Sequence, residues 1–112
     1  MSSYTGNLKN SVNYTVYVSS PDFTLPIFEY NVVVSNVAQN TNLYLPPVDR
    51  VPIGWTILIK NNNPLYYTTL VASGTDQIIN GPVVSSTFIL NMLDFIHIIS
   101  CQTSNGRVWN LF

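Results

Sequence analysis

The segment that most constrains the fold is residues 55–60, an alternating stretch enclosed by strong chain breakers. A double proline lies shortly before it, and the run Asn61-Asn62-Asn63-Pro64 closes it. Successive side chains of a β-strand point to opposite faces, so this segment has two distinct sides. One side carries Trp55, Ile57 and Ile59, and the other carries Thr56, Leu58 and Lys60. The alternation predicts a strand with the first set in the core and the second set facing away from it.

Short β-prone segments follow one another along the whole chain, separated by turn signals at intervals of roughly eight to twelve residues. They span residues 12–18, 23–37 with an interruption at Pro26, 43–45, 55–60, 65–71, 78–79, 83–90, 95–101 and 107–112. Asn80-Gly81 and Asn105-Gly106 are typical of tight hairpin turns. The apolar spacing over 88–99 also fits a helix, but Asn91, Asp94 and the β-branched residues of this stretch favour a strand.

This pattern predicts a single all-β domain that covers residues 1–112, a length sufficient for one compact core. We expect an antiparallel β-sandwich or jelly-roll-like fold of about eight short strands. Residues 1–11 are small and polar, and we expect them to form a flexible N-terminal arm.

The composition points to self-association. Charged residues make up 8% of the chain and hydrophobic residues 46%, whereas about 25% charged residues is usual. A surface solubilised by amides and hydroxyls has little charge repulsion against association, so we expect a homo-oligomer. The candidate interface residues are Leu58, which is apolar on the outward side, Val33, in a run that is apolar on both faces, and His97, which three copies could bring together around an axis.

The same composition disfavours nucleic-acid and membrane partners. The net charge is -1 and the four basic residues are scattered, so they predict no phosphate-binding track. No apolar run approaches the ~20 residues needed to span a bilayer. The N-terminal sequence has neither the basic nor the apolar region of a signal peptide, so we do not expect export by the general secretory route.

The residues with catalytic potential do not form a constellation. His97 is the only histidine, with Asp94 and Ser100 three residues to either side. On a strand, Asp94 and Ser100 share the face opposite to His97, so these residues cannot form a triad. Cys101 shares the face of His97 without a third group, and one histidine with one cysteine supplies no metal site within one chain. We therefore expect a non-enzymatic protein without cofactor or metal.

The aromatic residues, which include seven tyrosines, are the remaining candidates for recognition. Aromatic faces bind sugars and anchor protein interfaces. Tyr44 alternates with Leu43 and Leu45 and should point outward, and one of the adjacent residues Tyr66 and Tyr67 must face away from the core. These three tyrosines are the candidate receptor- or glycan-binding residues. Simple packing within the sheets is the alternative, since tyrosines are ordinary strand formers.

Residues 43–112 also contain a series of short motifs in a fixed order. The series is Leu45-Pro46-Pro47, the alternating strand from Gly54 to Lys60-Asn61, then Gly74-Thr75-Asp76, Ile79-Asn80-Gly81, and Gly106 followed by Trp109. In this order the chain resembles the C-terminal β-domains of viral fibre proteins, such as bacteriophage tail fibres and the fibre proteins of large DNA viruses and virophages. Residues 1–42 lie outside the resemblance.

The resemblance implies a homotrimeric, non-enzymatic virion structural protein. Such a protein would be a fibre-head-like module at the virion surface, assembled in the host cytoplasm, that engages a host receptor or glycan during attachment. The resemblance carries over no catalytic residues. The alternative function is that of a lectin-like carbohydrate-binding module, which does not exclude the first.

Overall fold

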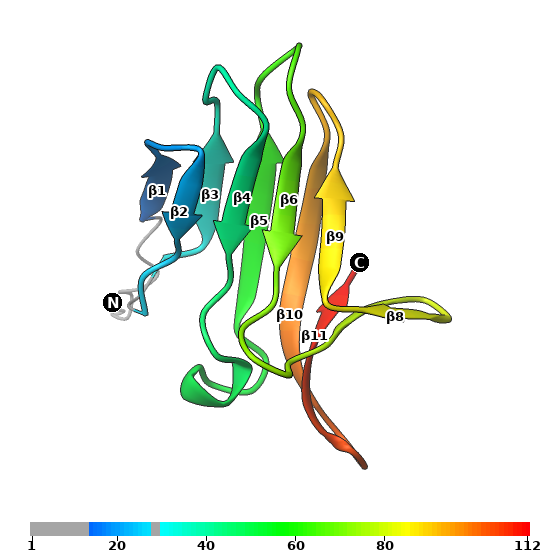
Figure 1. Ribbon diagram of the computed structural model, residues 1–112. Coiled ribbons are helices and arrows are strands. Elements are labelled where there is room, and N and C mark those ends of the chain that lie inside the picture. The colour runs from blue at the N-terminus through cyan, green and yellow to red at the C-terminus, as the bar shows by residue number, and fades with distance from the viewer. Residues whose placement is uncertain (1–13, 28–29) are drawn as a thin grey trace.

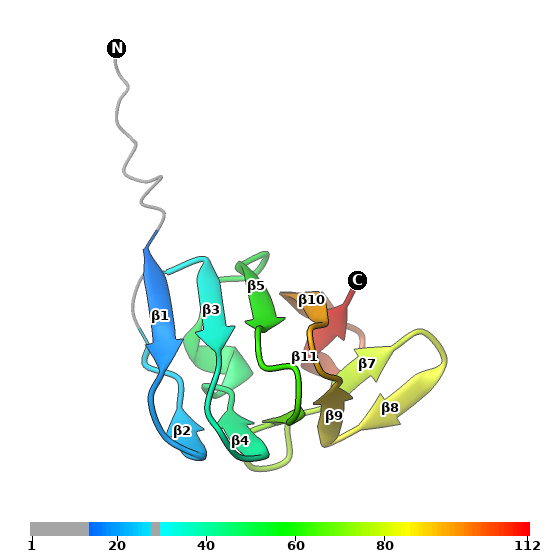
Figure 2. The same ribbon diagram turned by 90° about the horizontal axis from the view of Figure 1, so that it is seen from above.

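The computed structural model describes residues 14–27 and 30–112, and this part of the chain is almost entirely β, with one short 3-10 helix, η2 (Val48–Arg50). The expected arm, residues 1–11, lies outside the described residues. The described strands form two layered sheets (Figure 1, Figure 2), which confirms the all-β fold class. The large sheet has the order β1 (Thr15–Val18), β3 (Val32–Ser35), β5 (Thr56–Asn61), β10 (Phe95–Thr103), β11 (Gly106–Leu111), β7 (Ile78–Asn80) and β8 (Val83–Ser85). The small sheet has the order β2 (Asp22–Thr24), β4 (Thr41–Tyr44), β6 (Thr68–Val71) and β9 (Thr87–Leu90).

The chain winds between the two sheets from β1 to β6. Each strand lies in the sheet opposite to the strand before it, so strands two apart in the sequence become neighbours and point the same way (Figure 1). The pairs β1–β3, β3–β5, β2–β4 and β4–β6 are accordingly parallel. The expected antiparallel pairing is therefore wrong for this half of the molecule, and also for β7, which pairs parallel with β11. Antiparallel pairs join β5 to β10, β10 to β11, β7 to β8 and β6 to β9.

The described residues contain eleven strands, more than the roughly eight expected from turn spacing. The interruptions expected at Pro26 and at Asn80-Gly81 are present, and the two parts of segment 23–37 join different sheets, since Pro26 has no backbone N–H to give to a sheet. The extended stretch 83–90 is further divided near Ser86, where the chain passes from β8 in the large sheet to β9 in the small one.

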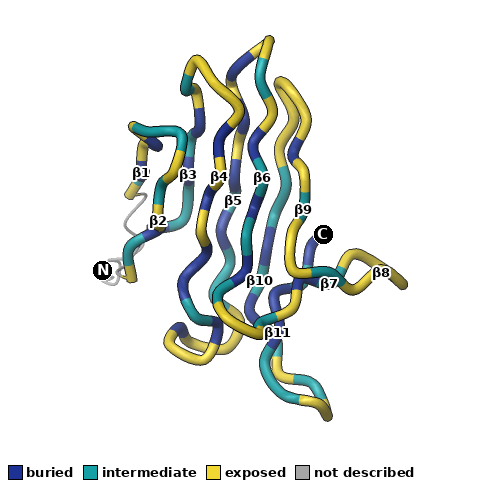
Figure 3. The backbone as a smooth tube through the Cα atoms, in the orientation of Figure 1, coloured by how far each residue is buried: buried dark blue, intermediate teal, exposed yellow. Residues whose placement is uncertain are grey.

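Both Asn-Gly sites are confirmed as hairpin turns. Gly81, with φ of 59°, lies between β7 and β8, and Gly106, with φ of 116°, is the first residue of β11, directly after the turn from β10. A positive φ suits glycine because it has no Cβ. The β7–β8 hairpin extends sideways from the two layers (Figure 2), and Val83 and Val84 on it are exposed (Figure 3).

The core lies between the two sheets. The predicted faces of segment 55–60 are confirmed, because Ile57 and Ile59 are completely buried and Trp55 packs, partly buried, against the same core. The small sheet contributes Leu43 and Leu70, which are likewise completely buried. Burying an aliphatic side chain contributes about 1.5–3 kcal/mol, so these inward positions supply most of the stability of the sandwich.

A row of three aromatic rings runs through one end of the core. The ring centroid of Trp55 lies 5.0 Å from that of Tyr30, in an edge-to-face arrangement, and 6.3 Å from that of Trp109. The Tyr30 hydroxyl donates a hydrogen bond of 2.8 Å to the Pro26 carbonyl. Burial raises the pKa of the Tyr30 phenol above its ordinary value, because the charged form would lose its hydration.

Two buried asparagines, Asn61 and Asn63, stabilise the loop that connects β5 to β6 through side-chain hydrogen bonds. The side-chain nitrogen of Asn61 donates to the carbonyls of Tyr66 at 2.9 Å and Asn91 at 3.1 Å, and its oxygen accepts from the N–H of Asn63 at 3.1 Å. The side-chain oxygen of Asn63 accepts from the N–H groups of Leu65 at 2.8 Å and Tyr66 at 3.1 Å. These bonds provide partners for backbone N–H and C=O groups that are buried but make no hydrogen bond to a neighbouring strand.

Candidate functional site

The outer face of the large sheet, the side turned away from the core, is apolar. Its residues alternate with fully buried ones such as Val33, Ile57 and Ile98, and no other described segment lies over it (Figure 2). Its central members, on β1, β3, β5 and the first half of β10 and directly after β11, include Tyr17, Val32, Val34, Thr56, Leu58, Lys60, Phe95, His97, Ile99 and Phe112. Thr15, Thr103 and Asn110 add polar groups toward its edges. Lys60 is the one charged side chain in this set.

An aromatic cluster lies on this outer face. The His97 ring stacks on the Phe112 ring, with centroids 5.4 Å apart, and meets the Phe95 ring edge-on at 6.4 Å. Phe95 and Phe112 are 57% and 61% exposed. Two large aromatic side chains with most of their surface in water are unusual on an otherwise well packed sheet, so the cluster is a candidate contact surface.

The structure brings two of the three interface candidates together. Leu58 is paired with His97 on one side and with Val32 on the other, and all are half-buried on the outer face. Val33 is wrong as an interface candidate, because it points into the core and is completely buried between the two sheets. The sequence run Val32-Val33-Val34 is apolar throughout and does not indicate which of its side chains point into the core. The pairing of Val33 with the buried Ile59 places Val33 on the core side.

The potential catalytic residues are held apart, as the strand period predicts. Ser100 is buried on the core side, where its hydroxyl donates to the Pro52 carbonyl and accepts from the Trp55 N–H. The Asp94 carboxylate accepts from the Phe95 N–H at the start of β10. His97 lies on the other face of the strand. Among residues 14–27 and 30–112, no three His, Cys, Asp or Glu side chains gather where they could hold a metal ion.

The outer face of the small sheet is more polar and carries Tyr44. Asp22 lies beside Asn42 across the β2–β4 pair, and Thr24 lies beside Tyr44 one step further along. One carboxylate oxygen of Asp22 accepts from the Asn42 amide at 3.1 Å and from the Tyr44 hydroxyl at 3.3 Å. These bonds fix the orientation of the Tyr44 ring. The ring is 36% exposed, which agrees with the predicted outward direction of this side chain.

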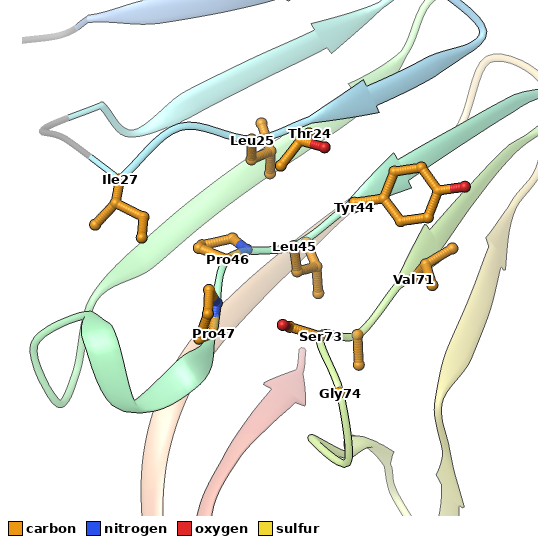
Figure 4. Close-up of a pocket in the computed structure, with 11 residues that line it drawn as sticks. Thr24, Leu25, Ile27, Tyr44, Leu45, Pro46, Pro47, Val71, Ser73 and Gly74 are labelled. Carbon is orange, nitrogen blue, oxygen red and sulfur yellow. The ribbon is translucent and has the colours of Figure 1, made fainter.

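A pocket of about 420 Å³ lies at the end of this face, next to Tyr44 (Figure 4). We call it the Tyr44 pocket. Its lining comes from the ends of β2, β4 and β6 and from the loops that follow them: Thr24, Leu25, Ile27, Tyr44, Leu45, Pro46, Pro47, Val71, Ala72, Ser73 and Gly74. None of these residues is charged, and the lining combines an apolar floor with one aromatic ring and two aliphatic hydroxyls.

The three candidate tyrosines do not form one site. Tyr67 is 39% exposed on the outer side of the small sheet, whereas Tyr66 is half-buried. The Tyr67 N–H donates to the side chain of Asn40, so Tyr67 lies near the start of β4 and Tyr44 at its end. Four residues of strand separate these levels, about 13 Å. A small ligand at the Tyr44 pocket therefore cannot also reach Tyr67.

The sequence indicated Tyr44 but not the pocket beside it. Thr24, Pro46 and Ser73 come from three separate segments, and parallel pairing of β2, β4 and β6 brings the ends of those segments together. The Leu45-Pro46-Pro47 motif was the available signal, since two prolines directly after an outward tyrosine turn the chain away from the sheet.

Comparison with known proteins gives no relative: no protein-family model, curated protein or solved structure matches this chain. Separately, none of the helical structure in the described residues has the length and hydrophobicity required to cross a bilayer.

Proposed function

We propose that the protein is a non-enzymatic structural module that assembles into a homotrimer through the outer face of the large sheet. The observation that carries this proposal is the character of that face, which is largely apolar, holds an exposed aromatic cluster, and has Lys60 as the one charged side chain on its described strands. A face of this kind in contact with water favours association, and a low content of charged residues does not oppose it.

The dimensions of the face are compatible with this proposal. The described strands of the large sheet contain 35 residues, which at about 3.3 Å per residue and about 4.8 Å per strand cover on the order of 550 Å². This is about two thirds of the ~800 Å² that each partner contributes to a standard stable interface, so the loops at the ends of the sheet would supply the rest of the contact.

The biological setting that we propose is a virion surface, with the module acting as a fibre head in attachment to a host. Two observations support it: the ordered motifs of residues 43–112, which resemble viral fibre domains, and a composition with 8% charged residues that suits a subunit of a larger particle. With the large sheet in the trimer interface, the small sheet would remain available to a receptor.

Light scattering coupled to gel filtration tests the assembly. We expect a trimer at micromolar concentration, and we expect Leu58→Lys or Phe95→Lys to raise the concentration for half-dissociation about a hundredfold or more, because an unpaired charge would be buried. Ile89→Lys is the matched control, since Ile89 is 54% exposed in β9 on the small sheet. A monomeric unmodified protein, or equal effects of all three substitutions, would refute this interface.

A second candidate function is carbohydrate binding by a lectin-like small sheet. The pocket beside the outward-facing Tyr44 favours it, because small-molecule sites combine an apolar cavity with a few fixed polar groups. This function is compatible with assembly through the opposite sheet. A glycan array probed with the labelled full-length protein tests it, and an array without hits would count against it.

A further inference from the structure

We propose that the Tyr44 pocket binds the ring of a neutral sugar, with the C–H face of the sugar on the Tyr44 ring and its hydroxyls on Thr24, Ser73 and Asp22. This inference rests on the second candidate function and names its site and the class of its ligand. It does not depend on trimer formation, because the pocket lies on the small sheet.

The size of the pocket fits one small ring. Its volume of about 420 Å³ is within the ~300–1,000 Å³ typical of small-molecule sites. The floor is preformed, since Leu25, Leu45 and Ala72 are buried in the hydrophobic core and cannot move without disturbing it. Pro46 and Pro47 form one wall and restrict the backbone there. A rigid pocket loses little conformational entropy when a ligand enters.

The Tyr44 ring supplies an apolar surface for one face of the ligand. The ring lies between Thr24 on β2 and Val71 on β6, and Figure 4 looks onto its flat side. The hydrogen bond from its hydroxyl to Asp22 holds the ring in this orientation. A pyranose ring presents several C–H groups on one face, and an aromatic side chain with an apolar body and a polar tip is suited to such a face.

The polar groups around the pocket match the hydroxyls of a sugar. The hydroxyls of Thr24 and Ser73 make no hydrogen bond to any residue in the described parts of the chain, and both line the pocket. One oxygen of the Asp22 carboxylate accepts hydrogen bonds from Asn42 and Tyr44. The other oxygen is available to accept a hydrogen bond from a ligand hydroxyl. A purely aliphatic ligand would leave these groups without partners, which costs affinity.

The charges near the pocket select against anionic sugars. Asp22 lies beside Tyr44 at one side, and Asp76, which accepts from the Val48 N–H at 2.9 Å, lies beyond Pro47 and Gly74 at the other. The pocket lining contains no basic side chain to offset these carboxylates. Arg107, which donates to the Val48 carbonyl at 3.5 Å, offsets part of the charge of Asp76, whereas nothing in the lining offsets Asp22. A carboxylate on the sugar would be repelled by Asp22 and attracted by no lining residue, so the favoured class is neutral.

Amide chemical-shift mapping on the isotope-labelled full-length protein tests this inference. The probes are D-glucose, D-galactose, D-mannose and N-acetyl-D-glucosamine, with N-acetylneuraminic acid as the anionic comparison, each raised to about 50 mM so that a millimolar site is filled. We expect at least one neutral sugar to shift the amides of Thr24, Tyr44 and Ser73 in a saturable manner, and the anionic sugar to bind more weakly.

Variants then identify the contacts. Tyr44→Ala should weaken binding of the responding sugar about tenfold or more, whereas Tyr44→Phe, which keeps the ring, should retain most of it. Thr24→Val and Ser73→Ala should each weaken it about fivefold. Tyr67→Ala, at the other end of the same sheet, is the matched control and should have no effect. An unchanged melting temperature shows that each variant is folded.

The possible failures are distinguishable. No response to any sugar would overturn both the pocket assignment and the carbohydrate-binding function, and would leave the assembly proposal intact. A response that maps to Tyr66 and Tyr67, or one that survives Tyr44→Ala, would overturn the pocket assignment alone. Tighter binding of N-acetylneuraminic acid than of the neutral sugars would overturn the ligand class.

Discussion

At the scale of single residues, Asn61 and Asn63 show what an asparagine run can do beyond ending a strand. Each side chain has one oxygen that accepts and one nitrogen that donates, and both ends are used inside the protein. Asn61 is 1% exposed and Asn63 is 9% exposed. The run Asn61-Asn62-Asn63-Pro64 was interpreted from the sequence as a chain breaker. It also holds in place the loop that it creates.

Replacement of Asn61 should be among the more damaging changes to a polar residue. Asn61→Ala removes the donor to Tyr66 and Asn91 and the acceptor of the Asn63 N–H, so we expect a loss of about 2–4 kcal/mol in the free energy of unfolding. Denaturant titration measures this loss. Asn62→Ala is the matched control, since Asn62 is exposed, and should change the free energy by about 0.5 kcal/mol or less. Equal effects of the two changes would contradict this role.

Burial of single residues could be predicted from the sequence where polar and apolar residues alternate. Ile57 and Leu58 lie on the predicted faces because the polar residues Thr56 and Lys60 mark one side of this strand. Tyr44 does so because it alternates with Leu43 and Leu45. Val33 lies among valines, so its sequence contains no such contrast, and its face is decided by pairing with β1 and β5. Pairing over that distance depends on the whole sheet rather than on local pattern.

At the scale of elements, the two kinds of connection in this fold differ in how strongly the local sequence determines them. The β7–β8 and β10–β11 hairpins follow from Asn-Gly pairs, since this dipeptide adopts the positive φ that a tight turn between antiparallel strands requires. The crossovers between sheets contain prolines and polar residues that end a strand without specifying its next neighbour. The antiparallel expectation failed at these crossovers.

The β7–β8 turn allows a direct test of this distinction. A Cβ on Gly81 would meet nothing within 4 Å, so Gly81→Ala should destabilise the hairpin through its backbone conformation alone, by about 1 kcal/mol. We expect amide exchange in the Ile79–Val84 pair to accelerate about fivefold. Gly81→Asn should have a smaller effect, because asparagine tolerates a positive φ. An exchange rate unchanged in Gly81→Ala would show that this conformation is not under strain in solution.

At the scale of the whole molecule, the two sheets present faces of opposite character. The outer face of the large sheet is apolar around Leu58 and His97, and that of the small sheet carries Asp22, Asn42 and Tyr44 with the pocket at its end. The proposed assembly and the proposed sugar site therefore use different sides of one sandwich. A substitution on one side should leave the function of the other side unchanged.

If the protomer is stabilised by assembly, its melting temperature must depend on concentration. For a trimer that unfolds to monomers, each tenfold dilution removes about 0.9 kcal/mol per protomer, and an unfolding entropy of about 0.24 kcal/mol/K for 112 residues converts this to a shift of about 4 °C. Calorimetry at three concentrations measures the shift. A dimer would give about 3 °C, and a concentration-independent melting temperature would contradict an obligate assembly.

The winding of β1 to β6 between the sheets also has a consequence for the order in which the chain folds. Within the described residues, the strands up to β6 pair with strands two places away, and β5 and β6 each take their second neighbour, β10 and β9, from the C-terminal half. A ribosome delivers the N-terminal strands first, and contacts between distant segments form slowly. The nascent chain must therefore keep Ile57 and Ile59 out of wrong contacts until β10 has been synthesised. This dependence makes the interval between translation of β5 and of β10 the period in which the protein is most prone to aggregate.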